Sequence, residues 1–81
     1  MIVIYSKPNC MYCDAAKNLL KEKKIEYVEL QIGGDISRDD FLEIFPAART
    51  VPVITVNEEW IGGFQELNEY VEKHYGNSNT N

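Results

Sequence analysis

The sequence contains few residues able to cross-link the chain or to hold a metal ion. Its 81 residues include two cysteines, one histidine and one tryptophan. A structural zinc site needs about four ligands, which two cysteines and the distant His74 do not supply. A disulfide between cysteines only three positions apart closes a small loop and constrains the unfolded chain little. Two interpretations remain for the cysteines: a redox-active pair, or two ordinary buried side chains.

Positive charge and long apolar runs are scarce as well. Eight lysines and arginines stand against thirteen aspartates and glutamates, which gives a formal net charge of -5 at pH 7. This charge disfavours nucleic acid and anionic membranes as partners, and it gives no reason to expect a dimer. No apolar run approaches the ~18 residues of a membrane span, and Met1-Ile2-Val3 does not begin a secretion signal. We therefore expect a cytoplasmic monomer in a reducing compartment, where paired thiols tend to be catalytic.

The two cysteines form a Cys-x-x-Cys motif, Cys10-Met11-Tyr12-Cys13. A β-branched run at residues 2–5 precedes the motif and a segment with helical periodicity follows it, so Cys10 should stand at a helix N-terminus. Unpaired N–H groups and the helix dipole stabilise a thiolate there, and Lys7 adds positive charge if it folds back over the sulfur. We predict that Cys10 attacks and that Cys13, one turn further in, resolves the mixed disulfide.

Hydrophobic periodicity predicts a single α/β domain at residues 1–75, followed by a flexible polar tail at 76–81. Strands joined through a helix should be parallel, and Asn57-Glu58 is a plausible two-residue hairpin turn between antiparallel strands. The result is a four-stranded mixed sheet with three helices in the order β-α-β-α-β-β-α. Strands are expected at 2–5, 25–32, 51–56 and 59–61, and helices at 11–24, 38–45 (with Ser37 as N-cap) and 64–75.

Four motifs, in order, make the chain resemble the glutaredoxins over residues 1–75. They are Ser6-Lys7, Cys10-Met11-Tyr12-Cys13, Arg49-Thr50-Val51-Pro52 and Gly62-Gly63-Phe64. The resemblance implies a thioredoxin-like fold with a cis Val51-Pro52 peptide. It also implies a glutathione-dependent thiol–disulfide oxidoreductase without a tightly bound cofactor, whose clients include ribonucleotide reductase.

The resemblance further implies a set of contacts to glutathione. Lys7 and Arg49 match positions that pair with the glycine carboxylate, and Val51 offers its backbone to the cysteinyl part. The N–H groups of Phe64 and Gln65 would hold the γ-glutamyl carboxylate at a helix N-terminus. The whole implied set is Lys7, Tyr12, Arg49, Thr50, Val51, Pro52, Gly62, Gly63, Phe64 and Gln65.

Two departures from the family pattern leave alternatives open. Met11 replaces a common proline, and Gln65 replaces a common aspartate that pairs with the glutamyl ammonium. One alternative is a glutaredoxin-like redoxin reduced by thioredoxin reductase. Another is a carrier of an iron–sulfur cluster ligated by two copies of Cys10 and two glutathiones. Trp60 and Phe64 could form an exposed patch for docking a protein substrate, but we expect Trp60 in the core of the hairpin.

Overall fold

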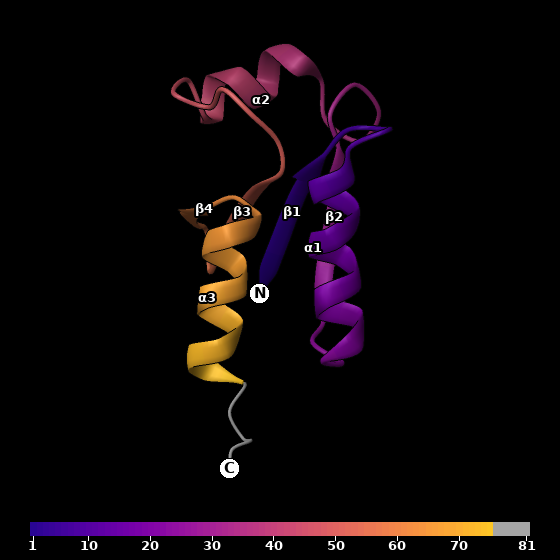
Figure 1. Ribbon diagram of the computed structural model, residues 1–81. Helices are drawn as coiled ribbons and strands as arrows, with labels where there is room; N and C mark the ends of the chain where they lie inside the picture. Colours follow the sequence, from indigo (N-terminus) through magenta and orange to yellow (C-terminus); the bar gives the residue numbers. More distant parts are fainter. Residues whose placement is uncertain (76–81) are drawn as a thin grey trace.

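The computed structural model describes residues 1–75, and the predicted polar tail at 76–81 lies outside the described residues. The described chain folds into one four-stranded sheet and three helices, as the sequence predicts (Figure 1). The strand order is β2-β1-β3-β4; β1 is parallel to β2 and antiparallel to β3, and β3 and β4 form a hairpin. The elements are β1 (Ile2–Ser6), α1 (Met11–Glu22), β2 (Tyr27–Gln31), α2 (Arg38–Ile44), β3 (Val53–Val56), β4 (Glu59–Gly62) and α3 (Phe64–His74).

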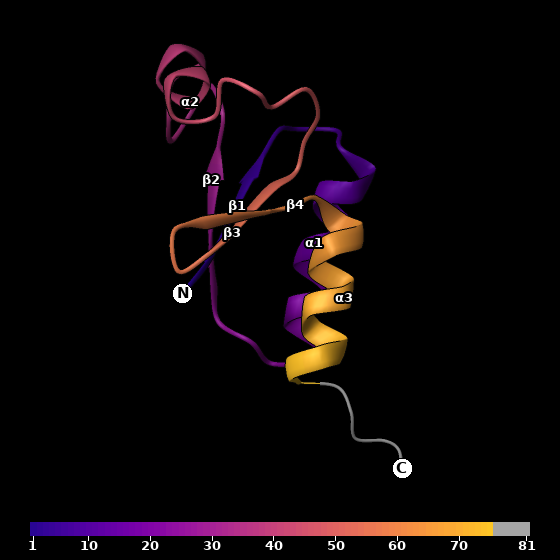
Figure 2. The ribbon, with the colours of Figure 1, turned by 90° about the vertical axis from the view of Figure 1, so that its left-hand side faces the viewer.

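The helices divide between the two faces of the sheet. Figures 1 and 2 show α1 and α3 side by side along one face, whereas α2 lies toward one end of the other face. The larger hydrophobic cluster joins the sheet to α1 and α3, and the smaller cluster packs Phe41 of α2 and its C-cap residue Phe45 against Val53. Tyr5 on β1 contacts both phenylalanine rings, with centroid distances of 5.6 and 5.0 Å. The larger cluster contains Ile2, Ile4, Ala16, Leu20, Ile54, Leu67 and Val71.

Several predicted boundaries were too wide, and each has a physical reason. α1 ends at Glu22 rather than near Lys24, because Lys24 adopts a left-handed conformation with φ of 58°. β3 begins at Val53 rather than Val51, since Pro52 has no N–H to donate to a strand partner. β2 begins at Tyr27 rather than residue 25. The segment before it closes the turn, where the Ile25 N–H donates to the Leu20 carbonyl.

The prediction that Trp60 lies in the core of the hairpin is wrong. Its side chain is 40% exposed and belongs to neither hydrophobic cluster. β4 is an edge strand, and the ring of Phe45, the C-cap residue of α2, lies edge-on to the indole with the ring centroids 5.6 Å apart. Trp60 therefore remains accessible to solvent.

The β3–β4 turn should become more stable when Glu58 is replaced by glycine. Asn57 and Glu58 both have positive φ, 51° and 73°, and a glutamate pays a steric cost there that glycine avoids. We expect Glu58→Gly to raise the free energy of unfolding by about 0.5–1 kcal/mol, measured by urea denaturation. The control is Glu59→Gly, one residue further in β4, which should lower stability instead. Equal effects of the two substitutions would contradict the turn geometry.

Candidate functional site

The two cysteines lie at the N-terminus of α1, as the sequence predicts. Cys10 is the N-cap residue, and the backbone N–H of Cys13 donates to Cys10 Sγ at 3.1 Å. The two form a disulfide, with their Cα atoms 5.2 Å apart. Cys10 is half-buried, whereas Cys13 is 1% exposed. Because a helix N-terminal N–H already points at its sulfur, Cys10 has the surroundings that favour a thiolate once the disulfide is reduced.

The loop before β3 lies against the dithiol. The Val51-Pro52 peptide is cis, as the family resemblance implies. The carbonyl oxygen of Val51 is 3.9 Å from Cys10 Sγ, and Pro52 is buried. A molecule bound to Cys10 would therefore meet the backbone of this loop.

A pocket with a volume of about 690 Å³ extends from this loop to the start of α3. Thr50, Val51 and Pro52 line it from the loop, Tyr12 lines it from α1, and α3 supplies its first residues. The rings of Tyr12 and Phe64 stack with centroids 6.0 Å apart. The predicted contacts Gly63, Phe64 and Gln65 also line this pocket, and Gly62 does not.

The two glycines before α3 serve the backbone more than a ligand. Gly62 has φ of 134°, and a Cβ atom there would collide with the side chain of Glu66. A Cβ on Gly63 would lie 3.3 Å from the Pro52 carbonyl oxygen, so this glycine lets α3 start close to the cis-proline loop. The Gly63 N–H donates to Glu66 Oε1 at 2.9 Å. The first bond of the helix runs from Leu67 to Gly63, so the N–H groups of Phe64 and Gln65 precede it.

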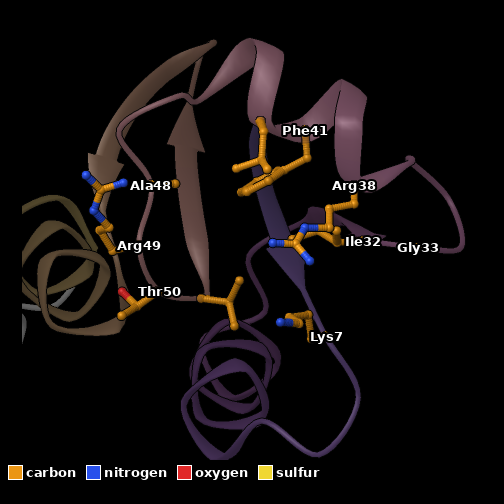
Figure 3. Close-up of a pocket in the computed structure, with 10 residues that line it drawn as sticks. Lys7, Ile32, Gly33, Arg38, Phe41, Ala48, Arg49 and Thr50 are labelled. Atoms are coloured by element: carbon orange, nitrogen blue, oxygen red, sulfur yellow. The ribbon is translucent and has the colours of Figure 1, made fainter.

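A second pocket, of about 520 Å³, adjoins the first and shares Thr50 and Val51 with it. Lys7 and Arg49, both predicted as contacts, line it together with Arg38, which sequence reasoning missed. Figure 3 shows Lys7 and Arg38 reaching toward the same part of the pocket, with Arg49 beside Thr50 across from them. Three cationic residues thus line one pocket of a chain whose net charge is -5. An anion is the ligand that this arrangement favours.

Arg38 escaped notice because its neighbours in the sequence are acidic. Ser37, Asp39 and Asp40 indicate the start of a helix, and the Ser37 hydroxyl does accept a hydrogen bond from the Asp40 N–H at 3.0 Å. The position of Arg38 in the fold is the one feature that could have indicated a role in binding. α2 starts shortly after the end of β2, which is parallel to β1, so Arg38 follows the same edge of the sheet as the dithiol loop. Ligands of α/β proteins bind beyond the carboxyl ends of such strands.

A third feature, a hydrogen-bonded network on the α1 side of the sheet, was also missed. The buried Ser6 hydroxyl donates to Glu29 Oε2 at 2.7 Å, and Lys17 Nζ donates to the same oxygen at 3.1 Å. The hydrogen bond from Ser6, followed by that from Lys17 and its charge, lowers the pKa of Glu29 against the opposing effect of desolvation. The hydrogen bond to Glu29 raises the pKa of Lys17. The network ties α1 to β2.

This network should make stability depend on pH on the acid side. Because folding lowers the pKa of Glu29, its contribution is complete above the ordinary value of 4.5 and is lost as the pH falls through the folded value. Glu29→Gln should therefore cost about 1 kcal/mol at neutral pH and progressively less below pH 4.5. Urea unfolding at a series of pH values measures this. Glu72→Gln, an exposed carboxylate on α3, is the control; a cost for Glu29→Gln that persists unchanged in acid would contradict the assignment.

The described residues bring no metal site together around His74. His74 is exposed and packs against Tyr70, with ring centroids 4.4 Å apart. Within residues 1–75, no three or more His, Cys, Asp or Glu side chains are grouped as metal ligands would be. The same part of the chain holds no helix with the length and apolar character that crossing a membrane requires.

The fold and the site define a class of protein. A mixed four-stranded sheet, a Cys-x-x-Cys disulfide at the N-terminus of α1 and a cis-proline loop against it together characterise a thioredoxin-like thiol–disulfide oxidoreductase. Within that class, the Glutaredoxin family model matches residues 2–61. The chain belongs to the glutaredoxin family.

Individual relatives agree with this assignment. Glutaredoxin-1 of Bos taurus is 36% identical over 72 residues, which cover 82% of this chain and 68% of the bovine protein. The crystal structure of Glutaredoxin 1 from Francisella tularensis, complexed with cacodylate, matches with a TM-score of 0.75 at 32% identity, over 89% of this chain and 92% of that one. A buckwheat glutaredoxin–glutathione complex shares the fold, with a TM-score of 0.71 at 24% identity, over 89% of this chain and 68% of that one.

Proposed function

We propose that this glutaredoxin uses glutathione to reduce protein disulfides and glutathione mixed disulfides. One observation carries the proposal: the half-buried Cys10 lies beside the carbonyl of Val51, and Val51 lines both a pocket with three cationic residues and a pocket at a helix N-terminus. Glutathione has a carboxylate at each end and a thiol between them. The cationic pocket can take one carboxylate and the helix N-terminus the other, while Cys10 Sγ takes the thiol between them.

The chemistry divides between the two cysteines. The Cys10 thiolate attacks one sulfur of the substrate disulfide, and the other sulfur leaves as a thiolate. Cys13 then attacks Cys10 Sγ, releases the reduced product and forms the Cys10–Cys13 disulfide. Two glutathione molecules return this disulfide to the dithiol and become oxidised glutathione. Where the substrate is itself a glutathione mixed disulfide, a second glutathione can replace Cys13, so that Cys10 alone suffices.

The glutathione contacts follow the two pockets. Lys7, Arg38 and Arg49 would hold the glycine carboxylate, and the backbone of Val51 would pair with the cysteinyl part as a strand does. Phe64 and Gln65 would offer their N–H groups to the γ-glutamyl carboxylate. That the buckwheat protein was solved as a glutathione complex supports this choice of ligand.

The partners proposed beyond glutathione are disulfide-bearing proteins, among which the family resemblance puts ribonucleotide reductase first. Met11 and Tyr12 are 77% and 60% exposed beside the disulfide, so a client would contact them while its own disulfide reaches Cys10. We propose that the protein works as a monomer in the cytoplasm, since a glutathione-fed dithiol requires a reducing compartment.

The binding mode can be tested by trapping glutathione on the enzyme. In a Cys13→Ser variant, oxidised glutathione should form a stable mixed disulfide with Cys10. Backbone amide NMR signals of Val51, Phe64 and Gln65 should then shift, and that of Asn57, at the far hairpin turn, should stay in place. A shift of the Val51 signal without shifts of Phe64 and Gln65 would overturn the proposed contacts.

A further inference from the structure

The network of Ser6, Glu29 and Lys17 shares α1 with the resolving cysteine, and the chemistry described above does not use it. Lys17 follows Cys13 by one helical turn on α1, so their Cβ atoms are about 6 Å apart on one helix face. Ser6 is the last residue of β1, and Glu29 aligns with Ile4 on the neighbouring strand. The network therefore stands at the end of the sheet from which the chain enters the dithiol loop.

The Lys17 ammonium is fixed by two carboxylates, Asp14 on α1 and Glu29 on β2. Side chains on a helix lean toward its N-terminus, which directs Lys17 back over the turn that contains Cys13. Lys17 Nζ lies 3.6 Å from Oδ1 of Asp14, which precedes it by three residues, so the side chain does extend toward the N-terminus of α1. Glu29 holds the ammonium from the sheet side at 3.1 Å, and the fully buried Ser6 fixes Glu29 in turn. With its side chain only 22% exposed, Lys17 is less screened than a free surface lysine.

We propose that Lys17 is a positioning residue for the resolving step, in which its fixed ammonium favours the Cys13 thiolate. In this step a bond forms between Cys13 Sγ and Cys10 Sγ while the bond from Cys10 to the departing sulfur breaks. The departing thiolate takes up the proton that Cys13 has lost, so no outside oxidant or reductant is needed. The inference rests on the proposed function, which gives Cys13 the resolving role.

Few charged groups compete with Lys17 in this region. On α1 the neighbouring charge is Asp14, which is 69% exposed, and β2 contributes Glu29. β1 contributes the neutral Ser6 hydroxyl, and the buried residues of α3 are apolar. Glu29 therefore opposes Lys17 electrostatically while fixing its place. Removing the charge of Lys17 should therefore disfavour the Cys13 thiolate, and removing the charge of Glu29 should favour it.

The test is a single-turnover reaction of the reduced protein with a chromogenic aromatic disulfide. Attack by Cys10 releases the first aromatic thiolate, and attack by Cys13 releases the second, so the second rate reports the resolving step. Lys17→Met should move the midpoint of its pH profile upward by about one unit, which slows it about tenfold at pH 7. Glu29→Gln keeps an oxygen acceptor for Ser6 and Lys17 but removes the negative charge, so it should move the midpoint downward.

Opposite shifts distinguish this role from a structural one, because both substitutions break the same ion pair and both should lower stability. Lys17→Arg should restore the wild-type midpoint, and Lys21→Met, an exposed lysine one turn further along α1, should leave it unchanged. Midpoints that move together, or not at all, would overturn the inference while the proposed function stands. Absence of the second release in the wild type would overturn the proposed function itself and this inference with it.

Discussion

Cys10→Ser should lose turnover on every disulfide substrate, by about a thousandfold or more, because the attacking thiolate is gone. Cys13→Ser should behave differently with two kinds of substrate. It should retain most of its activity on glutathionylated peptides, which need only Cys10 and a second glutathione. It should lose most of its activity on protein disulfides, whose mixed disulfide with Cys10 waits for Cys13. The measurement is NADPH consumption coupled through glutathione and glutathione reductase.

This difference follows from burial as well as from order in the chain. Cys10 is half-buried at the helix N-cap, whereas Cys13 is 1% exposed and can reach only its partner. The control is the wild-type protein alkylated before assay, in which modification of Cys10 alone should abolish both activities. Equal losses in Cys10→Ser and Cys13→Ser on glutathionylated peptide would contradict the assigned roles.

Removing both arginines from the cationic pocket should weaken the use of glutathione without affecting the dithiol itself. In Arg38→Met/Arg49→Met, the glycine carboxylate of glutathione loses two charge-assisted partners near Lys7. We expect KM for glutathione to rise about tenfold. The rise would be larger if these arginines were buried, but both side chains are exposed to solvent. The rate of Cys10 attack on the aromatic disulfide should stay within about a factor of two, since Cys10 keeps its helix N-terminus.

A matched change in charge elsewhere separates this effect from long-range attraction. Lys73→Met/Lys24→Met removes two cations at the other end of the α1–α3 layer and should leave KM for glutathione unchanged. Added salt should raise KM in the wild type and much less in the double arginine variant. A similar rise in KM for both double variants would show that net charge, and not the pocket, attracts glutathione.

The order of elements could be predicted from the sequence because each element has a clear period or boundary residue. β1 alternates between Ile2 and Ile4 facing the main core and Tyr5 facing Phe41, and α1 carries its apolar stripe through Ala16 and Leu20. The dithiol could be predicted for the same reason, since a helix start is a local property. Strand ends were less certain, because they depend on which backbone groups find a partner.

Arg38 and the Glu29–Lys17 pair were missed because long-range pairing brings them to the site. Nothing near Arg38 in the sequence indicates a ligand, and only the folded sheet brings it to the pocket of Lys7 and Arg49. Likewise Lys17 is one of two lysines on α1, and its partner lies twelve residues away on β2. The Trp60 prediction failed for a related reason, since sequence does not say how far the short α2 extends over the edge strand.

Supplying electrons from two sources to the same protein tests the central claim most directly. The oxidised protein, with its Cys10–Cys13 disulfide, would receive electrons either from glutathione and glutathione reductase or from thioredoxin reductase alone, with NADPH consumption as the readout. Sustained turnover with glutathione, and little with thioredoxin reductase, is the result expected from the two pockets beside Cys10. Turnover sustained by thioredoxin reductase alone, with glutathione ineffective, would contradict the account.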